Sequence, residues 1–453
     1  MPDEGLVQQG PESDFSLRKM VIAAACLFGA TFVPYVQATI APLMMLPMMK
    51  ELGWTRTEYA FGSTFLFIFG SITVLAYGRI ADRIGVRPIL LAGSVFGGAT
   101  MLLLSLQTSQ LWRFYATYAL LGAFGSSGVG YTKIIGSLFT RHRGKALALF
   151  GAESTVALAV LPVLTNAFIS RFGWRGTYVA FAIIMFALTP VIFLLIQEPG
   201  VKTPFFRSGA GAAKSGGPPP RKLPPMEGMT ISEIRRDRVF WLIVLSAVLG
   251  FGLSVGLSAH IIAAITDKGF SPTVAAEVLS VSTLMGLVGT FAGGFAVDHF
   301  RDARPMAAFG VLSAAGLLLF ALATAAFGGL PLLILAMALQ GMAVAAMRPV
   351  ATYLQTRFLG LRAFGEANAI QVVFQGFAMA ASPPLFGIVF DRTGSYAPMY
   401  WVLIVASIAG SAVFLFLGPY RYRTDIGVDL GTPPIGGRDQ AGGLELAKVA
   451  DDT

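Results

Sequence analysis

The fold is decided by the stretch Gly78-Arg79-Ile80-Ala81-Asp82-Arg83-Ile84-Gly85-Val86-Arg87-Pro88. It holds three arginines and one aspartate, and the apolar segments on either side are each long enough to cross a bilayer. Arginines in a short loop between two spans set the orientation of those spans in the membrane. The stretch therefore predicts a loop at the surface of an integral membrane protein.

The composition of the whole chain agrees with a membrane protein. Of 453 residues, 55% are hydrophobic and only 13% are charged, whereas soluble proteins average about 25% charged residues. The mean hydropathy is +0.70, so the apolar surplus must face lipid, and water-soluble enzymes are excluded. Cys26 is the single cysteine, which excludes an internal disulfide and redox chemistry that needs a cysteine pair.

Segments of about 20 mostly apolar residues predict transmembrane helices. Twelve are expected, at residues 20–46, 57–78, 88–106, 111–138, 145–169, 176–196, 239–265, 273–297, 306–327, 330–356, 365–389 and 399–418. The polar segments between and around them predict a tail at 1–19, a Gly/Pro-rich linker at 197–238 and a second tail at 419–453. Two membrane bundles, 20–196 and 239–418, remain.

The net charge of +9 follows the same topology. Basic residues concentrate in the loops after even-numbered spans, so the positive-inside rule predicts that both termini are cytoplasmic, in a bacterial inner membrane. This distribution explains the charge better than nucleic-acid binding does.

An internal repeat indicates that the two bundles are related. Four markers recur at a constant offset of 216 residues: Gly53 and Gly269, Gly78 and Gly294, Asp82 and Asp298, Arg141 and Arg357. Parallel repeats of this kind place a substrate site at the interface between the halves. The fold class expected is therefore all-α, with twelve transmembrane helices in two six-helix repeats.

The pattern G-x-x-A-D-R-x-G-x-R in the opening stretch resembles the signature loop between helices 2 and 3 of major facilitator superfamily transporters. The resemblance implies that Asp82 caps a neighbouring helix and pairs with a basic residue, which latches the cytoplasmic side. It implies gating roles for Gly78, Asp82, Arg83, Gly85, Arg87 and, in the second half, Asp298. Asp298 lacks the D-R-x-G context, and a loop that only sets topology is the alternative.

Three charged residues are expected at membrane depth, where an ionised side chain costs about 2.5–3.5 kcal/mol on insertion scales and is a functional candidate. Lys133 and Arg348 lie on the fourth and tenth spans, and 133 plus 216 is 349, one residue from Arg348, so both are expected to face the central cavity from opposite halves. Arg348 cannot deprotonate and indicates an anionic substrate. Glu153 is either the proton-coupling carboxylate or a structural partner of Lys133.

Other polar residues in the spans predict neighbours of these charges. Gln340, Gly341, Arg348, Thr352 and Gln355 share one helical face, which indicates either close helix packing or a ligand path. The further substrate-binding candidates are Tyr35, Tyr131, His260, Gln371 and Gln375. A lone histidine such as His260 is more often structural than ligand-binding.

Looser segments resemble the monocarboxylate and oxalate/formate-type branch of that superfamily. They include Gly53-Trp54-Thr55-Arg56, Gly173-Trp174-Arg175 and Asp391-Arg392-Thr393-Gly394. The chain departs from animal-type monocarboxylate transporters because residues 281–290 lack their aspartate and arginine, and residues 31–46 lack their lysine. Lys133 and Arg348 are the expected substitutes.

The expected function is secondary transport of a small organic anion, a monocarboxylate or aromatic carboxylate, by alternating access with proton-coupled uptake. The alternatives are a proton-antiporting exporter of drugs or amphiphiles and a non-transporting membrane receptor. The sequence contains no nucleotide-binding loop, metal cluster or nucleophile–base set, so no enzyme activity, cofactor or metal is expected. The partners expected of this monomer are the organic anion, protons and the lipid bilayer.

Overall fold

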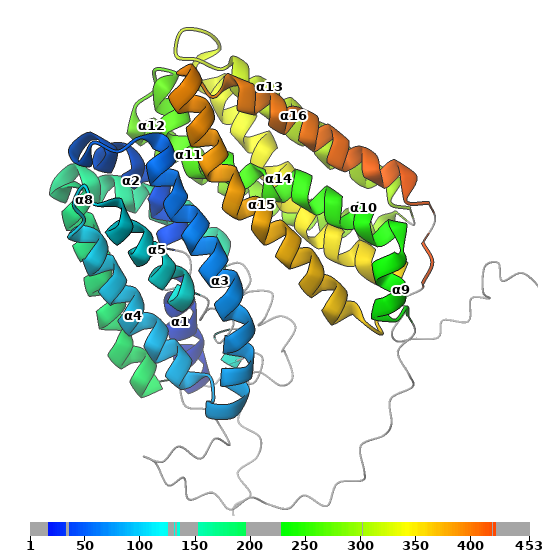
Figure 1. Ribbon diagram of the computed structural model, residues 1–453, viewed down its shortest axis with the longest axis horizontal. Helices are drawn as coiled ribbons and strands as arrows, with labels where there is room; N and C mark the ends of the chain where they lie inside the picture. Colours follow the sequence, from blue (N-terminus) through cyan, green and yellow to red (C-terminus); the bar gives the residue numbers. More distant parts are fainter. Residues whose placement is uncertain are drawn as a thin grey trace, which may run out of the picture.

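The computed structural model describes residues 17–32, 36–125, 131, 134–135, 153–195, 228–300, 302–418 and 420–422, which are almost entirely helical (Figure 1). Within these residues, eight helices are long and apolar enough to cross a membrane. The elements of the first half are α1 (Leu17–Phe32), α2 (Val36–Leu52), α3 (Arg56–Ile84), α4 (Arg87–Ser105), α5 (Leu111–Gly125) and α8 (Glu153–Leu195). Those of the second half are α9 (Ile231–Arg236), α10 (Arg238–Ala247), η2 (Val248–Gly252), α11 (Ser254–Asp267), α12 (Pro272–His299), η3 (Arg304–Met306), α13 (Ala307–Leu322), α14 (Gly329–Leu359), α15 (Phe364–Thr393), α16 (Ala397–Ala412) and η4 (Val413–Phe416).

The two halves form separate bundles, blue to teal and green to orange in Figure 1. Helix α8 is two helices that meet at Gly173, whose φ of 68° and ψ of 178° break the helical path. This break separates the spans predicted at 145–169 and 176–196. A left-handed φ costs a residue with a side chain about 1–2 kcal/mol, so glycine suits this junction.

The repeat is visible in the backbone. Adding 216 to Arg56, where α3 begins, gives Pro272, where α12 begins. The glycines before these helices are also equivalent, and both are left-handed, with φ of 73° at Gly53 and 90° at Gly269. The same turn geometry therefore recurs at the same place in each half.

The signature stretch is more helical than expected. Helix α3 continues to Ile84, and only Gly85 and Val86 separate it from α4. After Gly78, the next helix-breaking residue is Gly85, which has a φ of 88°. Pro88 lies in the first turn of the next helix, where proline is favoured. The expectation of a loop from Gly78 onward was wrong, since most of the stretch is the end of α3.

Two other predicted spans are interrupted. The span predicted at 20–46 consists of α1 and α2, with residues 33–35 outside the described residues. The span predicted at 239–265 consists of α10 and α11, joined by the π-helical turn η2.

The end of the predicted linker is ordered and attached to the second half. Helix α9 lies inside the predicted linker and begins with a capping box between Thr230 and Glu233. The Thr230 backbone N–H donates to the Glu233 carboxylate and holds the pKa of that group below its usual value. The Met229 N–H donates to the Leu359 carbonyl, which fixes this segment to the end of α14.

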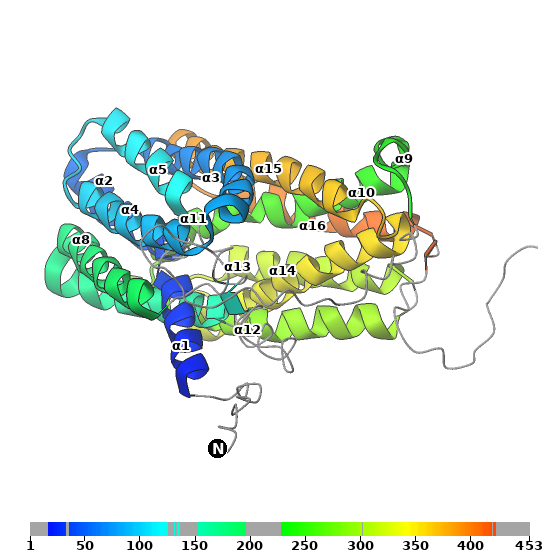
Figure 2. The same ribbon diagram turned by 90° about the horizontal axis from the view of Figure 1, so that it is seen from below.

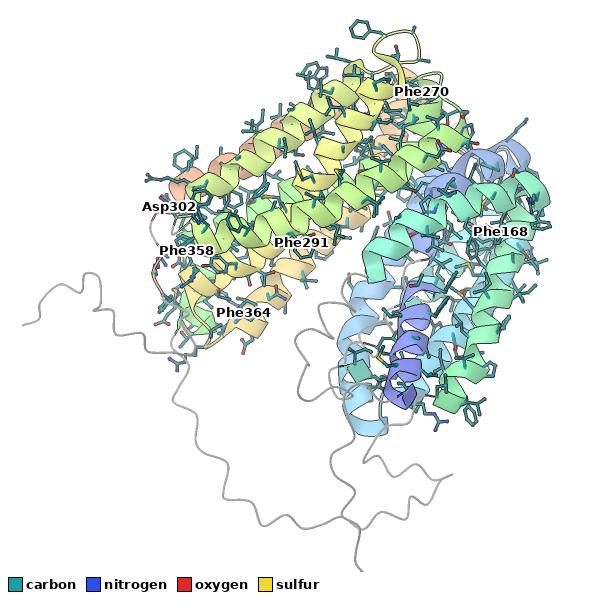
Figure 3. The ribbon with its side chains drawn as sticks, turned by 180° about the vertical axis from the view of Figure 1, so that it is seen from behind. Phe168, Phe270, Phe291, Asp302, Phe358 and Phe364 are labelled. Carbon is teal, nitrogen blue, oxygen red and sulfur yellow. The ribbon has the colours of Figure 1, made fainter. Side chains whose placement is uncertain are left out.

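The bundles converge at one end of the molecule and diverge towards the other (Figures 1 and 3), and Figure 2 looks at the molecule from the diverging end. We call the converging end, where α3 begins and α11 ends, the closed end, and the other, near α9, the open end. Figure 3 shows Phe270 near the closed end and Asp302 and Phe364 at the far end of the second bundle. The halves interlock, because Leu43 of α2 belongs to the second half's core and Ala263 of α11 belongs to the first half's core.

Candidate substrate site

A cavity of about 160 Å³ lies in the second half between α10, η2, α14 and α15. Apolar cavities of about 150 Å³ hold benzene, so this space suits a small molecule. Its lining comprises Ser246, Ala247, Gly250, Phe251, Met347, Ala351, Thr352, Asn368, Gln371, Val372 and Gln375. Hydroxyl and amide groups therefore converge on a space that is otherwise apolar, as in most small-molecule sites.

The π turn η2 shapes one wall of this cavity. Single π turns inside α-helices occur frequently at functional sites. Gly252 packs tightly, because a Cβ added there would lie 2.7 Å from the Ala378 Cβ. A Cβ added at Gly250 would meet nothing within 4 Å. The turn thus brings α11 close to α15 and leaves open space beside Gly250.

Helix α15 contributes an amide face. Asn368, Gln371 and Gln375 are spaced three and four residues apart, so they lie on one side of the helix. The Gln355 side chain on α14 donates to the Gln371 carbonyl oxygen, and the Gln375 amide lies 3.5 Å from the Ala247 carbonyl. The predicted candidates Gln371 and Gln375 both line the cavity, together with Asn368, which the sequence analysis did not select.

Helix α14 places the backbone of residue 348 next to the cavity. Met347, Ala351 and Thr352 line the cavity, and residue 348 lies one turn before the last two on the same helix. The Arg348 side chain lies outside the described residues, so its role stays a prediction.

The face predicted on α14 divides into two parts. A Cβ added at Gly341 would lie 2.0 Å from the Ser282 carbonyl oxygen, so Gly341 serves close packing against α12. Gln340 accepts a hydrogen bond of 3.0 Å from Ser313. Only the later part of the face, at Thr352, reaches the cavity.

The first-half candidates are less fully described. Tyr35 and Lys133 lie outside the described residues, and so does the side chain of Glu153, the first residue of α8. Tyr131 is fully buried, and a Cβ added at Gly29 would lie 2.5 Å from its hydroxyl oxygen. Tyr131 therefore packs tightly against α1.

His260 does not join the cavity residues. It is fully buried near the closed end, with Nδ1 2.8 Å from the Tyr396 hydroxyl and Nε2 3.0 Å from the Pro383 carbonyl oxygen. A carbonyl only accepts, so Nε2 carries the proton and Nδ1 accepts from Tyr396. Both ring nitrogens are occupied by protein groups.

The predicted gating residues lie at the open end of α3 and α12. The structure does not describe the side chains of Asp82, Arg83 and Asp298. The surroundings of Gly78 are likewise outside the described part of the chain. Arg87 donates to the Phe193 carbonyl, with its guanidinium 4.6 Å from the centre of the Phe193 ring. Arg87 thus joins α4 to the end of α8 within one half.

A charged cluster at the closed end was missed. Arg56 of the first half lies 2.6 Å from Asp267 and 2.7 Å from the Tyr396 hydroxyl, both in the second half. Asp391 accepts from the Thr57 backbone N–H at 2.9 Å. The repeat offset could have found Asp267, because 267 minus 51 is 216 and Glu51 lies in an equivalent ion pair.

Comparison with protein-family models decides the family. The model of the Major Facilitator Superfamily matches residues 26–315 and 256–435, well over half of the chain. The chain belongs to the major facilitator superfamily. The twelve-helix, two-repeat fold of that superfamily confirms the predicted fold class, and the chain is a membrane-spanning transporter, not an enzyme.

Several named transporters are similar in sequence to the chain, two of them over three quarters of its length or more. Monocarboxylate transporter 11 of Homo sapiens is 26% identical over 353 residues, which cover 75% of this chain and 70% of that protein. Monocarboxylate transporter 13 of Bos taurus is 25% identical over 425 residues, 92% of this chain and 90% of that protein. A probable L-galactonate transporter of Escherichia coli is 28% identical over 193 residues, 41% of this chain and 40% of that protein.

A solved structure shares the fold. The crystal structure of a bacterial homologue of the human lysosomal transporter Spinster, inward-facing and occupied, has a TM-score of 0.62 at 14% identity. It covers 90% of this chain and 95% of that chain. The predicted resemblance to the superfamily and to its monocarboxylate transporters is thereby confirmed.

Proposed function

We propose that this transporter moves a small organic anion, a monocarboxylate or aromatic carboxylate, across the bacterial inner membrane by alternating access. Uptake is coupled to proton entry, and both termini are cytoplasmic. The observation that carries the proposal is the cavity lined by Thr352, Asn368, Gln371 and Gln375 beside the helical turn that holds Arg348. The relatives named monocarboxylate transporters support the same substrate class.

Each polar group has a distinct role in this proposal. Arg348 binds the carboxylate, because a guanidinium presents paired donors that match the two carboxylate oxygens. The amides of Asn368 and Gln375 orient the remainder of the molecule. Lys133 and Glu153 assist substrate binding or carry the coupled proton.

The test is a thermal-shift screen of the purified protein against organic acids, amines and neutral amphiphiles. A ligand at 100 times its dissociation constant stabilises the folded state by about 2.7 kcal/mol. We expect one class of carboxylates to stabilise the protein and Arg348→Gln to abolish that effect. Arg357→Gln is the matched control, because Arg357 lies on the same helix but binds the Tyr353 hydroxyl at 2.7 Å.

Stabilisation by amines or neutral compounds, unchanged in Arg348→Gln, would refute the anion proposal in favour of export. A flux assay in proteoliposomes distinguishes a transporter from a receptor that only binds the ligand. Flux of the stabilising acid that rises with an inward proton gradient supports coupled uptake, and binding without flux contradicts it.

A further inference from the structure

The two halves use different charge arrangements at equivalent places of the closed end. In the first half, Glu51 at the end of α2 accepts from Arg175 at 2.9 Å and from the Trp174 indole at 2.6 Å. Arg175 follows the turn glycine Gly173 by two residues. This ion pair lies entirely within one half, so it does not oppose movement between the halves.

The second half keeps the acid and lacks the cation. Asp267 is the counterpart of Glu51, at the repeat offset of 216. At the same offset of 216, the position of Arg175 corresponds to Asp391, which is an acid. Gly394 also has a left-handed φ, 70° against 68° at Gly173, but its ψ is 7° rather than 178°, and counting two residues from it gives Tyr396, at an offset of 221. By either alignment, the second half has no cation at the place of Arg175.

Arg56 supplies the missing cation from the opposite half. Its two terminal nitrogens donate to the two oxygens of Asp267 at 2.6 and 2.9 Å, a bidentate arrangement, and one of them also donates to Tyr396 at 2.7 Å. The guanidinium carbon lies 3.5 Å from the centre of the Phe390 ring, and Arg56 is only 7% exposed. Although the Asp267 carboxylate is partly exposed, a bidentate pair is geometrically specific and stronger than a hydrogen bond between neutral groups.

The start of α3 is also capped from the opposite half. Asp391 of α15 accepts from the backbone N–H of Arg56 at 3.3 Å and of Thr57 at 2.9 Å, and from the Thr57 hydroxyl at 2.5 Å. The first N–H groups of a helix have no partner inside that helix. Separation of the halves would therefore leave these groups, as well as Arg56 and Asp267, in need of new partners.

We infer that Arg56, with Asp267, Tyr396 and Asp391, is a latch that holds the closed end shut and sets how often that end opens. The inference rests on the proposed alternating access, which requires this end to open once in every cycle. Because the second half has no cation at the place of Arg175, the partner of Asp267 comes from the first half, and the ion pair joins the two halves.

The test measures opening without any substrate, so its outcome is independent of the anion proposal. Ala263 is fully buried and packs in the core of the opposite half, one turn before Asp267. Replacement of the single native cysteine by Cys26→Ala gives a background in which Ala263→Cys reports separation of the halves through its alkylation rate. We expect Arg56→Gln and Asp267→Asn each to raise that rate about tenfold or more, which corresponds to about 1.4 kcal/mol.

Arg175→Gln is the matched control, because it removes the equivalent ion pair within one half. It is expected to lower the melting temperature without raising the alkylation rate by more than about twofold, a difference of roughly 0.4 kcal/mol. The latch is refuted if Arg56→Gln and Asp267→Asn leave the rate unchanged, or if Arg175→Gln raises it equally. Melting curves of every variant show whether the protein is folded, and Arg56→Gln keeps the test valid if Asp267→Asn does not fold.

Discussion

Arg56 and Asp267 lie 2.6 Å apart across the interface between the two halves, although 211 residues separate them in the chain. Their environments differ, because the Arg56 side chain is 9% exposed and that of Asp267 is 35% exposed. Removal of the arginine would leave a partly hydrated carboxylate, whereas removal of the aspartate would leave a buried guanidinium. A buried charge that loses its partner is strongly destabilising, so Asp267→Asn should cost more folding stability than Arg56→Gln.

The hydroxyl of Tyr396 connects this pair to His260. It accepts from Arg56 and donates to Nδ1 of His260, and neither His260 nor Tyr396 is more than 3% exposed. Tyr396→Phe would leave a buried ring nitrogen without its donor, at a cost of about 1–3 kcal/mol. We expect a lower melting temperature, and a smaller effect for Tyr115→Phe, whose hydroxyl bonds the Glu58 carbonyl in a half-buried setting. Equal effects of the two substitutions would contradict the proposed role of His260 as a buried acceptor.

Gly387 permits the close approach of α15 to α3. A Cβ added there would lie 2.6 Å from the Thr57 Cα, which belongs to the opposite half. We expect Gly387→Ala to push the halves apart and to speed alkylation of the Ala263→Cys reporter by roughly tenfold, equivalent to about 1.4 kcal/mol.

Gly341→Ala is the comparison for this substitution. It creates a more severe overlap, 2.0 Å from the Ser282 carbonyl oxygen, but inside the second bundle. It should lower the melting temperature by the usual overpacking cost of about 1–3 kcal/mol without a matching rise in the alkylation rate. If Gly387→Ala and Gly341→Ala raise the alkylation rate of the Ala263→Cys reporter equally, the close packing at Gly387 does not hold the two halves together.

Gly53 is required for its backbone conformation rather than for space. Its φ is 73°, and an added Cβ would meet nothing within 4 Å. Gly53→Ala should therefore destabilise the protein by about 1–2 kcal/mol through left-handed strain alone. Gly365→Ala on α15 also has open space, yet its backbone is helical, so it should be neutral or stabilising by up to about 1 kcal/mol. A lower melting temperature in Gly53→Ala, together with an equal or higher one in Gly365→Ala, would support the turn geometry. An unchanged melting temperature in Gly53→Ala would contradict it.

The fold could be predicted because its determinants are local. The length of each apolar run and the arginines between runs identify spans without knowledge of tertiary contacts. Helix ends were harder to predict, as the continuation of α3 to Ile84 shows, because no breaker follows Gly78 until Gly85. Gln371 and Gln375 were predicted as hydrogen-bonding neighbours of the charged residues, and both line the cavity. Asn368, one turn earlier on the same face, was not predicted.

The closed-end cluster could not be predicted from local pattern. Arg56 and Asp391 stand beside turns, where charges usually only meet water or set topology, and nothing in their neighbourhoods pairs them. The pairing depends on how two bundles dock, which is a property of the whole molecule. The comparison of repeats contains the signal, because Asp267 corresponds to Glu51 while the second half has no cation at the place of Arg175.

Asn368, on the amide face of α15, should bind ligand without supporting the fold. Asn368 is half-buried and lines the cavity, so Asn368→Ala would remove one hydrogen-bonding group at little cost to the empty protein. A hydrogen bond to the uncharged part of the ligand contributes about 0.5–1.5 kcal/mol, which predicts a loss of affinity of roughly 2- to 13-fold for the acid found in the screen. Titration calorimetry of the purified variant measures this change directly. Gln110→Ala, at an exposed position in the loop before α5, should leave the affinity unchanged. An unaltered affinity in Asn368→Ala would show that the anion binds elsewhere in the molecule, and a lower melting temperature of the ligand-free variant would make Asn368 a structural residue.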